Sequence, residues 1–159
     1  MKSFAESVTI AANPERVWQA LTTPTEVVCW DTGIIRPLDA PLDYPKPGQH
    51  VRWQYRLGPL PLVLHDHPTR VETASTLASS IRLGPFDFEE IYTLREIAAS
   101  ETELTAELSL TSRLPIIGTL LERVAGEPLA RSTVQTSLAA IKRHCEDPSS
   151  SDLEMSTGA

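Results

Sequence analysis

The sequence has few cysteines, few glycines and no long apolar run. Two cysteines in 159 residues do not make a disulfide framework and are typical of reduced thiols in a cytoplasm. The N-terminus lacks a basic-then-apolar signal segment, and no apolar stretch is long enough to cross a bilayer. We therefore expect a cytoplasmic protein with no integral membrane association.

Several kinds of functional site are also missing. No Gly-rich phosphate loop, nucleophile elbow or dinucleotide fingerprint is present, and almost all of the 7 glycines fall at expected turns. The net charge of -7 and the absence of a Lys/Arg cluster count against nucleic acid as a partner. The hydrophobic content of 41% is that of an ordinary globular domain, and nothing indicates a cofactor.

The N-terminal part predicts a strand and two helices in quick succession. Val8 and Ile10 alternate with polar neighbours, as in a strand with one buried face. Asn13-Pro14 supplies an N-cap and a proline for the first helical position. Pro24 then begins a second short helix.

Period-two alternation dominates the middle of the chain and predicts a meander of antiparallel strands. Pro68 interrupts one of them, where we expect a bulge or a sheet edge. The expected strands are Gly33–Leu38, Gln49–Leu57, Leu60–Thr73, Thr76–Leu83, Phe86–Ile97 and Thr102–Arg113.

Helical spacing returns near the C-terminus. Apolar residues share a face over 117–124, Gly126–Pro128 breaks or bends the segment, and Leu129–Glu146 is a second stretch with one apolar side. We expect one domain over residues 1–147 and a disordered polar tail over 148–159.

This order of elements resembles the START-like (SRPBCC) superfamily, in particular its polyketide cyclase/dehydrase and lipid-transport branch. The segment from Ser7 to Asp31 and the join Arg113–Gly118 carry the resemblance, which covers residues 3–146. It implies an α+β helix-grip fold, in which a curved antiparallel sheet of about six or seven strands wraps around a long C-terminal helix. Two short helices follow the first strand. It also implies an internal cavity for an apolar ligand, but the superfamily shares no catalytic motif.

Strand alternation predicts which side chains face the inside of a curved sheet. Aromatic residues gather in the inward phase, and Trp53, Tyr55, Phe86 and Phe88 are candidate ligand contacts. Such rings either line a cavity or fill a solid core, because both have the same sequence signature.

Glu90 is in phase with these apolar neighbours. A buried carboxyl must be paired, protonated or solvated by cavity water. Glu90 is therefore a candidate catalytic acid or base in a cavity, the partner of Arg131 on the final helix, or a residue exposed by a shifted strand register. Tyr92, with Tyr55 as the alternative, is a candidate hydrogen-bond donor to a developing enolate.

His65 and His67 share one face of a strand, but their apolar neighbours leave open which face this is. If they point inward, His65 is a second candidate base and His67 a polar contact at the cavity mouth. A zinc site would need a third ligand, and neither His50 nor His144 completes one. We predict no metal.

Three more residues are candidate ligand contacts. Trp30 either lies over the cavity entrance or anchors the second helix to the sheet. Arg131 and Gln135 belong to the final helix, where Arg131 is either solvated or paired with Glu90 or a ligand acid.

The sequence thus predicts a monomer or homodimer that binds a polyketide, aromatic or isoprenoid/lipid-like molecule inside the domain. One alternative is an enzyme of the cyclase, dehydratase or isomerase type that works by orientation and proton transfer. A lesser alternative is a stress- or chaperone-associated interaction module, which would need an exposed apolar patch.

Overall fold

The computed structural model describes residues 2–112 and 126–151. The strands are β1 (Lys2–Ile10), β2 (Ile34–Pro37), β3 (Val51–Leu57), β4 (Leu60–Glu72), β5 (Thr76–Leu83), β6 (Phe86–Ala98) and β7 (Glu101–Ser112). The helices within the described residues are α1 (Pro14–Thr22), α2 (Pro24–Trp30), α4 (Gly126–Glu146) and α5 (Pro148–Ser151). This is the α+β arrangement that the order of patterns predicts.

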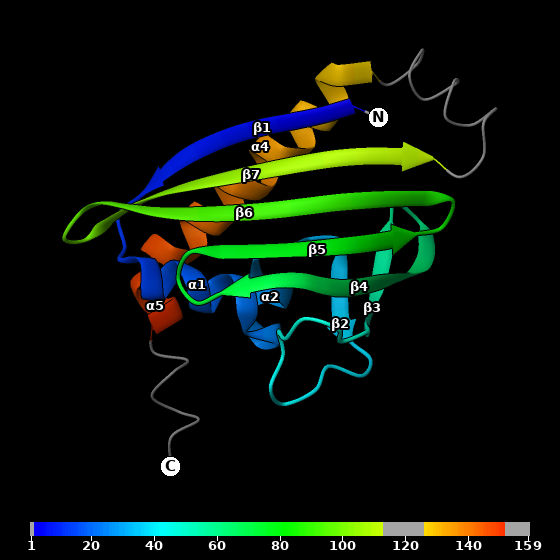
Figure 1. The fold of residues 1–159 in the computed structure, drawn as a ribbon, viewed down its shortest axis with the longest axis horizontal. Coiled ribbons are helices and arrows are strands. Elements are labelled where there is room, and N and C mark those ends of the chain that lie inside the picture. The colour runs from blue at the N-terminus through cyan, green and yellow to red at the C-terminus, as the bar shows by residue number, and fades with distance from the viewer. Residues whose placement is uncertain (1, 113–125, 152–159) are drawn as a thin grey trace.

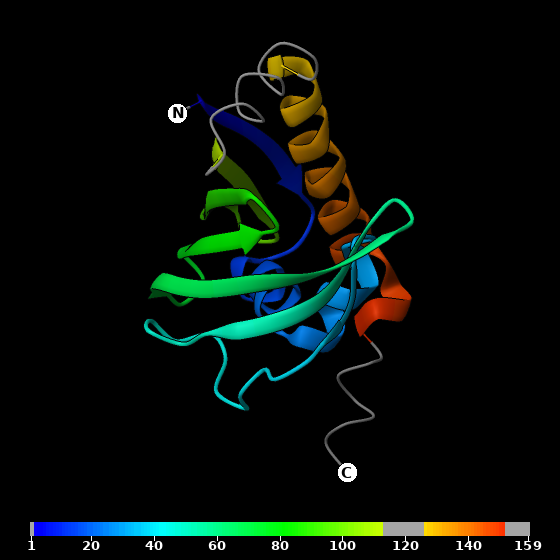
Figure 2. The ribbon, with the colours of Figure 1, turned by 90° about the vertical axis from the view of Figure 1, so that its right-hand side faces the viewer.

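All seven strands form one antiparallel sheet in the order β1-β7-β6-β5-β4-β3-β2. Figure 1 shows the meander and α4 crossing behind it, and Figure 2 shows the sheet curving away from α4. Helices α1 and α2 close one end of the concave side. The curved sheet and the long C-terminal helix confirm the predicted helix-grip fold.

The predicted irregularity at Pro68 is also present. The register between β4 and β5 shifts between Pro68 and Arg70, which is a local bulge. Proline cannot donate a ladder hydrogen bond, so a bulge accommodates it. The bulge follows the part of β4 that faces the concave side of the sheet.

Helix α4 is fixed by its apolar stripe. Val134, Leu138, Ile141 and Cys145 are all buried and join the main hydrophobic core, as their spacing predicts. The helix packs chiefly against β1, and also against α1, α2 and β7. It therefore lies toward one edge of the sheet.

Two boundary predictions need correction. The C-terminal helix begins at Gly126 rather than at Leu129, because Gly126–Pro128 forms the first turn of α4, where proline is tolerated. The expected helical segment 117–124 lies outside the described residues. The tail was predicted to be disordered from residue 148, which is wrong for Pro148–Ser151 because these residues form α5. Residues 152–159 lie outside the described part of the chain.

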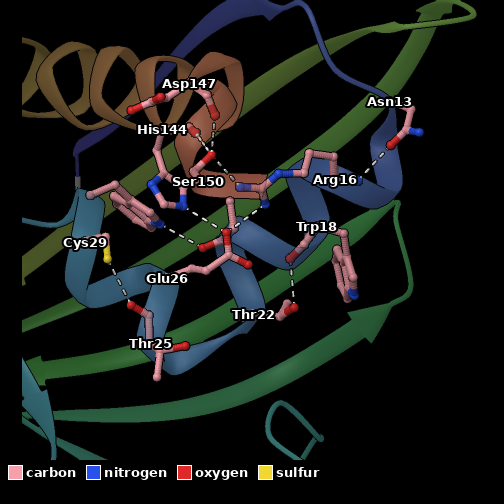
Figure 3. Close-up of polar contacts among 12 residues, drawn as sticks. Asn13, Arg16, Trp18, Thr22, Thr25, Glu26, Cys29, His144, Asp147 and Ser150 are labelled. Atoms are coloured by element: carbon pink, nitrogen blue, oxygen red, sulfur yellow. Dashed lines mark hydrogen bonds and ion pairs between the residues drawn. The ribbon is translucent and has the colours of Figure 1, made fainter. Parts of the chain in front are cut away.

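A buried polar cluster explains why α5 is ordered (Figure 3). Glu26 of α2 is 5% exposed, and its Oε1 accepts a hydrogen bond from Arg16 Nη1 at 2.7 Å. His144 Nε2 of α4 lies 2.8 Å from the same oxygen. Arg16 Nη2 also donates to Ser150 Oγ at 3.1 Å, and that hydroxyl donates to the His144 carbonyl at 2.6 Å. The cluster around Glu26 thus joins all four described helices.

Replacing Glu26 should be strongly destabilising. Glu26→Ala leaves the guanidinium of Arg16 largely buried without its counter-charge, so we expect a loss of about 3–5 kcal/mol in the free energy of unfolding. Urea denaturation measures the change. Glu89→Ala, which removes an exposed carboxylate of β6, is the matched control and should stay within about 0.5 kcal/mol of the wild type. Equal effects of the two substitutions would contradict the role of the cluster.

Candidate functional site

A cavity of about 590 Å³ lies between the concave face of the sheet, α2 and α4. Its volume falls within the roughly 300–1,000 Å³ typical of small-molecule sites. Strands β3 to β6 supply the largest share of its wall, and β7 adds Leu108. The concave side is therefore not packed solid.

More than half of the predicted site residues line this cavity. They come from the end of α2, from β3 and from β6: Trp30, Trp53, Tyr55, Phe88, Glu90 and Tyr92. Trp30 lines the cavity, and its Nε1 donates to the Ala20 carbonyl at 2.7 Å, which ties α2 to α1.

The two histidines of β4 do not reach the cavity. Leu64 and Asp66 line it, so strand alternation puts His65 and His67 on the opposite, convex face. There they meet His50, whose Nε2 lies 2.9 Å from His65 Nδ1 and whose ring stacks on His67 at 4.3 Å. Over residues 2–112 and 126–151, no group of three or more potential ligands is arranged to hold a metal ion. His65 is thus not placed to act as a cavity base.

Three other candidates also lie elsewhere. Arg131 forms an ion pair with Glu6 of β1, not with Glu90. Gln135 is exposed and does not line the cavity, because its side of α4 turns away from it. Phe86 stands at the start of β6 with its ring centroid 6.4 Å from that of Phe88, outside the cavity wall.

The sequence reasoning missed a polar part of the wall. Helix α4 contributes four small hydroxyl side chains beside its apolar stripe: Ser132, Thr133, Thr136 and Ser137. Their recurrence at one-turn spacing was a usable signal. Asp66 follows from the phase of β4, which Pro68 obscured, whereas Tyr44 sits in an irregular connection with no periodicity.

Asp31 and Tyr55 are positioned by the junction between α2 and β2. Asp31 Oδ1 accepts hydrogen bonds from the backbone N–H of Gly33 at 2.9 Å and of Ile34 at 3.3 Å. A Cβ at Gly33 would come within 2.4 Å of the Tyr55 ring, so only glycine allows this ring to lie over the junction. The cavity wall therefore includes the Asp31 carboxyl and the Tyr55 ring at this junction, in addition to Asp66 and Glu90.

The carboxyls of the cavity have perturbed proton affinities. Burial, followed by the charges of Asp31 and Asp66, raises the pKa of Glu90 to about 8, and the nearby Tyr92 hydroxyl opposes this shift. Burial also raises the pKa of Asp66 and of Asp31. Glu90 is consequently protonated at neutral pH and can both donate and recover a proton in that range.

The comparisons with known proteins agree with this geometry. Residues 1–146 match the profile of the family described as polyketide cyclase / dehydrase and lipid transport. The chain belongs to this family. No curated protein matches it in sequence.

Solved structures that resemble this family member have low sequence identity, so their likeness concerns the fold alone. A START superfamily protein from Mycobacterium smegmatis is 15% identical, with a TM-score of 0.67 over 89% of this chain and 97% of that one. The Zhui aromatase/cyclase from Streptomyces sp. R1128 is 15% identical, with a TM-score of 0.64 over 90% and 94%. DynU16, described as a putative protein in the dynemicin biosynthetic locus, is 21% identical, with a TM-score of 0.65. The match with DynU16 covers 92% of this chain but 48% of DynU16, so the chain spans about half the length of that protein.

None of the helices in the described residues is long and apolar enough to span a membrane.

The raised pKa of Glu90 makes a signed prediction about stability. The folded state keeps this proton up to about pH 8, whereas an unfolded glutamate loses it near 4.5. Between these values the wild type should lose stability with rising pH, by at most about 1.4 kcal/mol per pH unit from this group. Glu90→Gln removes that contribution, so the variant should gain stability relative to the wild type as the pH rises. Urea denaturation at several pH values measures the difference. Glu89→Gln is the control, and parallel curves for wild type and Glu90→Gln would contradict the assignment.

Proposed function

We propose that this member of the family binds a hydrophobic small molecule, of the polyketide, aromatic or isoprenoid/lipid-like class, inside the cavity. The observation that carries the proposal is a cavity of about 590 Å³ whose wall combines aromatic rings and aliphatic side chains with hydroxyl and carboxyl groups. The apolar side chains of the wall, Leu21 and Leu108 among them, supply hydrophobic contact area for a ligand. The hydroxyl and carboxyl groups of the wall would orient it.

The rings of the wall are held in place independently of any ligand. Trp53 is 2% exposed and packs edge-on against Tyr44, with ring centroids 5.8 Å apart. Trp30 is fixed by its hydrogen bond to the Ala20 carbonyl. A wall whose rings are already ordered loses little side-chain entropy when a ligand binds, which favours affinity.

Blocking the cavity from α4 tests this proposal. Thr136 lines the cavity and is exposed, so Thr136→Trp should fill space without disturbing the buried core and should weaken ligand binding at least about tenfold. Gln135→Trp, one residue away on the same helix but outside the wall, should bind as the wild type does. Calorimetric titration with a panel of naphthyl and long-chain alcohols measures both. If the panel binds equally to both variants, the cavity is not the binding site.

A second candidate function, favoured by the pKa of Glu90, is catalysis in the same cavity. Glu90 would give a proton to, or take one from, a bound polyketide, and Tyr92 would donate a hydrogen bond to the developing enolate. The description of one similar solved protein as an aromatase/cyclase, and of another as part of a biosynthetic locus, supports this candidate. His65 takes no part in it, because it faces away from the cavity.

Turnover of a model poly-β-ketone thioester separates catalysis from binding alone. If the chain is a cyclase or dehydratase, Glu90→Gln should lower the rate about 10²–10⁴-fold, as expected for loss of a general acid or base. The wild-type rate should also change with an apparent pKa near 8. Glu89→Gln is the control. Product formation followed by mass spectrometry decides, and equal rates in the two variants would exclude Glu90 as the acid or base.

A further inference from the structure

The cavity is acidic as well as apolar. Three carboxyl side chains from three separate elements line it: Asp31 at the end of α2, Asp66 on β4 and Glu90 on β6. Among the described residues, the one basic side chain of the wall is Arg56, which is exposed near the end of β3. A carboxylate, phosphate or sulfate on a ligand would therefore lie beside acidic groups rather than basic ones inside the cavity.

The hydrogen bonding of the Asp66 carboxyl gives separate evidence about the charge of the ligand. The residue is 5% exposed, and its Oδ2 accepts a hydrogen bond from Tyr44 Oη at 2.8 Å. Its Oδ1 is buried and has no hydrogen-bond partner of good geometry within the described structure, although Ser79 and Trp53 lie close enough to the carboxyl to lower its pKa. A buried carboxyl with so little compensation costs free energy, part of which a cation in the cavity would recover.

The aromatic rings of the wall can contact a cation through their faces, as well as the apolar part of a ligand. Trp30, Trp53 and Tyr44 belong to the same wall as Asp66, and the edge-on contact of Trp53 with Tyr44 lies beside that carboxyl. Aromatic faces attract ammonium groups, most strongly where water is excluded. Carboxyls and rings together form the surroundings that a protonated amine prefers.

We infer that the ligand carries a protonated amine on a hydrophobic body, with the amine facing the carboxyls of Asp66, Glu90 and Asp31. The inference rests on the proposed function, because it needs the cavity to be the binding site. It excludes fatty acids and other anionic amphiphiles as preferred ligands.

Proton release should accompany binding of such a ligand. A cation in the cavity favours the ionised forms of Glu90, Asp66 and Asp31, whose proton affinities burial has increased. The other titratable groups that act on these carboxyls are Tyr44, Tyr55 and Tyr92 in the wall, and His67 from the convex face. The phenols of this set ionise above pH 10, so carboxyls supply the released protons.

Three ligands with one hydrophobic body test the inference: 2-(2-naphthyl)ethylamine, 2-(2-naphthyl)ethanol and 2-naphthylacetate. Calorimetry at pH 7 should give the order amine, alcohol, carboxylate, with the amine at least about tenfold tighter than the alcohol. Titrations in two buffers of different ionisation enthalpy should show protons released with the amine. The affinity for the amine should rise from pH 6 to pH 8, and that for the alcohol should not.

Two variants localise the effect. Asp66→Asn should reduce the preference for the amine over the alcohol about tenfold, whereas Glu89→Gln, which removes an exposed charge, should leave it unchanged. If Asp66→Asn fails to fold, the ligand series and the proton count on the wild type still decide. An alcohol that binds as tightly as the amine, or a preference for the carboxylate, overturns this inference alone. Absence of binding by all three overturns it together with the cavity function.

Discussion

The docking of α4 along β1 is the constraint on which the cavity depends. The apolar stripe Val134, Leu138 and Ile141 is buried against the core, and polar contacts fix the same side of the helix. Lys142 Nζ donates to the carbonyl of Thr9 at 2.7 Å, and the backbone N–H of Ala11 donates to Glu146 Oε1 at 2.9 Å. Because these contacts hold α4 beside β1, the helix does not pack against β3 to β5. The neighbouring face of α4, with its small hydroxyl side chains, then borders open space rather than a solid core.

The carboxyls inside the protein have two kinds of surroundings. Glu26 forms an ion pair with Arg16 and lies within hydrogen-bond distance of His144, so it links the helices at their junction. Glu90 and Asp66 line the cavity, and burial raises their pKa values. Acidic groups that a fold does not neutralise lower its stability, and they are concentrated at sites where function requires them. The difference between the two sets points to the cavity rather than to the helix junction as the functional site.

The architecture could be predicted because each of its elements has a local cause. Period two marked the meander, the N-cap Asn13 and Pro14 marked α1, and Asn13 Oδ1 indeed accepts from the Arg16 N–H at 2.9 Å. Part of the site follows from alternation in β3 and β6, where Trp53 and Glu90 are in phase with apolar neighbours. In β4, apolar residues occur in both phases and the register shifts after Pro68, so the sequence does not say whether the histidines or Asp66 face the cavity. Tyr44 could not be predicted, because nothing local in an irregular connection says where its ring will pack.

Binding and catalysis in this cavity would be linked through one set of protons. In the empty protein Glu90 keeps its proton at neutral pH, because burial and two neighbouring carboxyls disfavour its charge. A cationic ligand reverses that balance, since it compensates the carboxylates that face it. Glu90 would then be an acid in the empty cavity and a base in the occupied one. An uncharged polyketide would not cause this change and would meet Glu90 as a proton donor beside Tyr92. The charge of the ligand would therefore determine whether Glu90 can act as an acid or as a base.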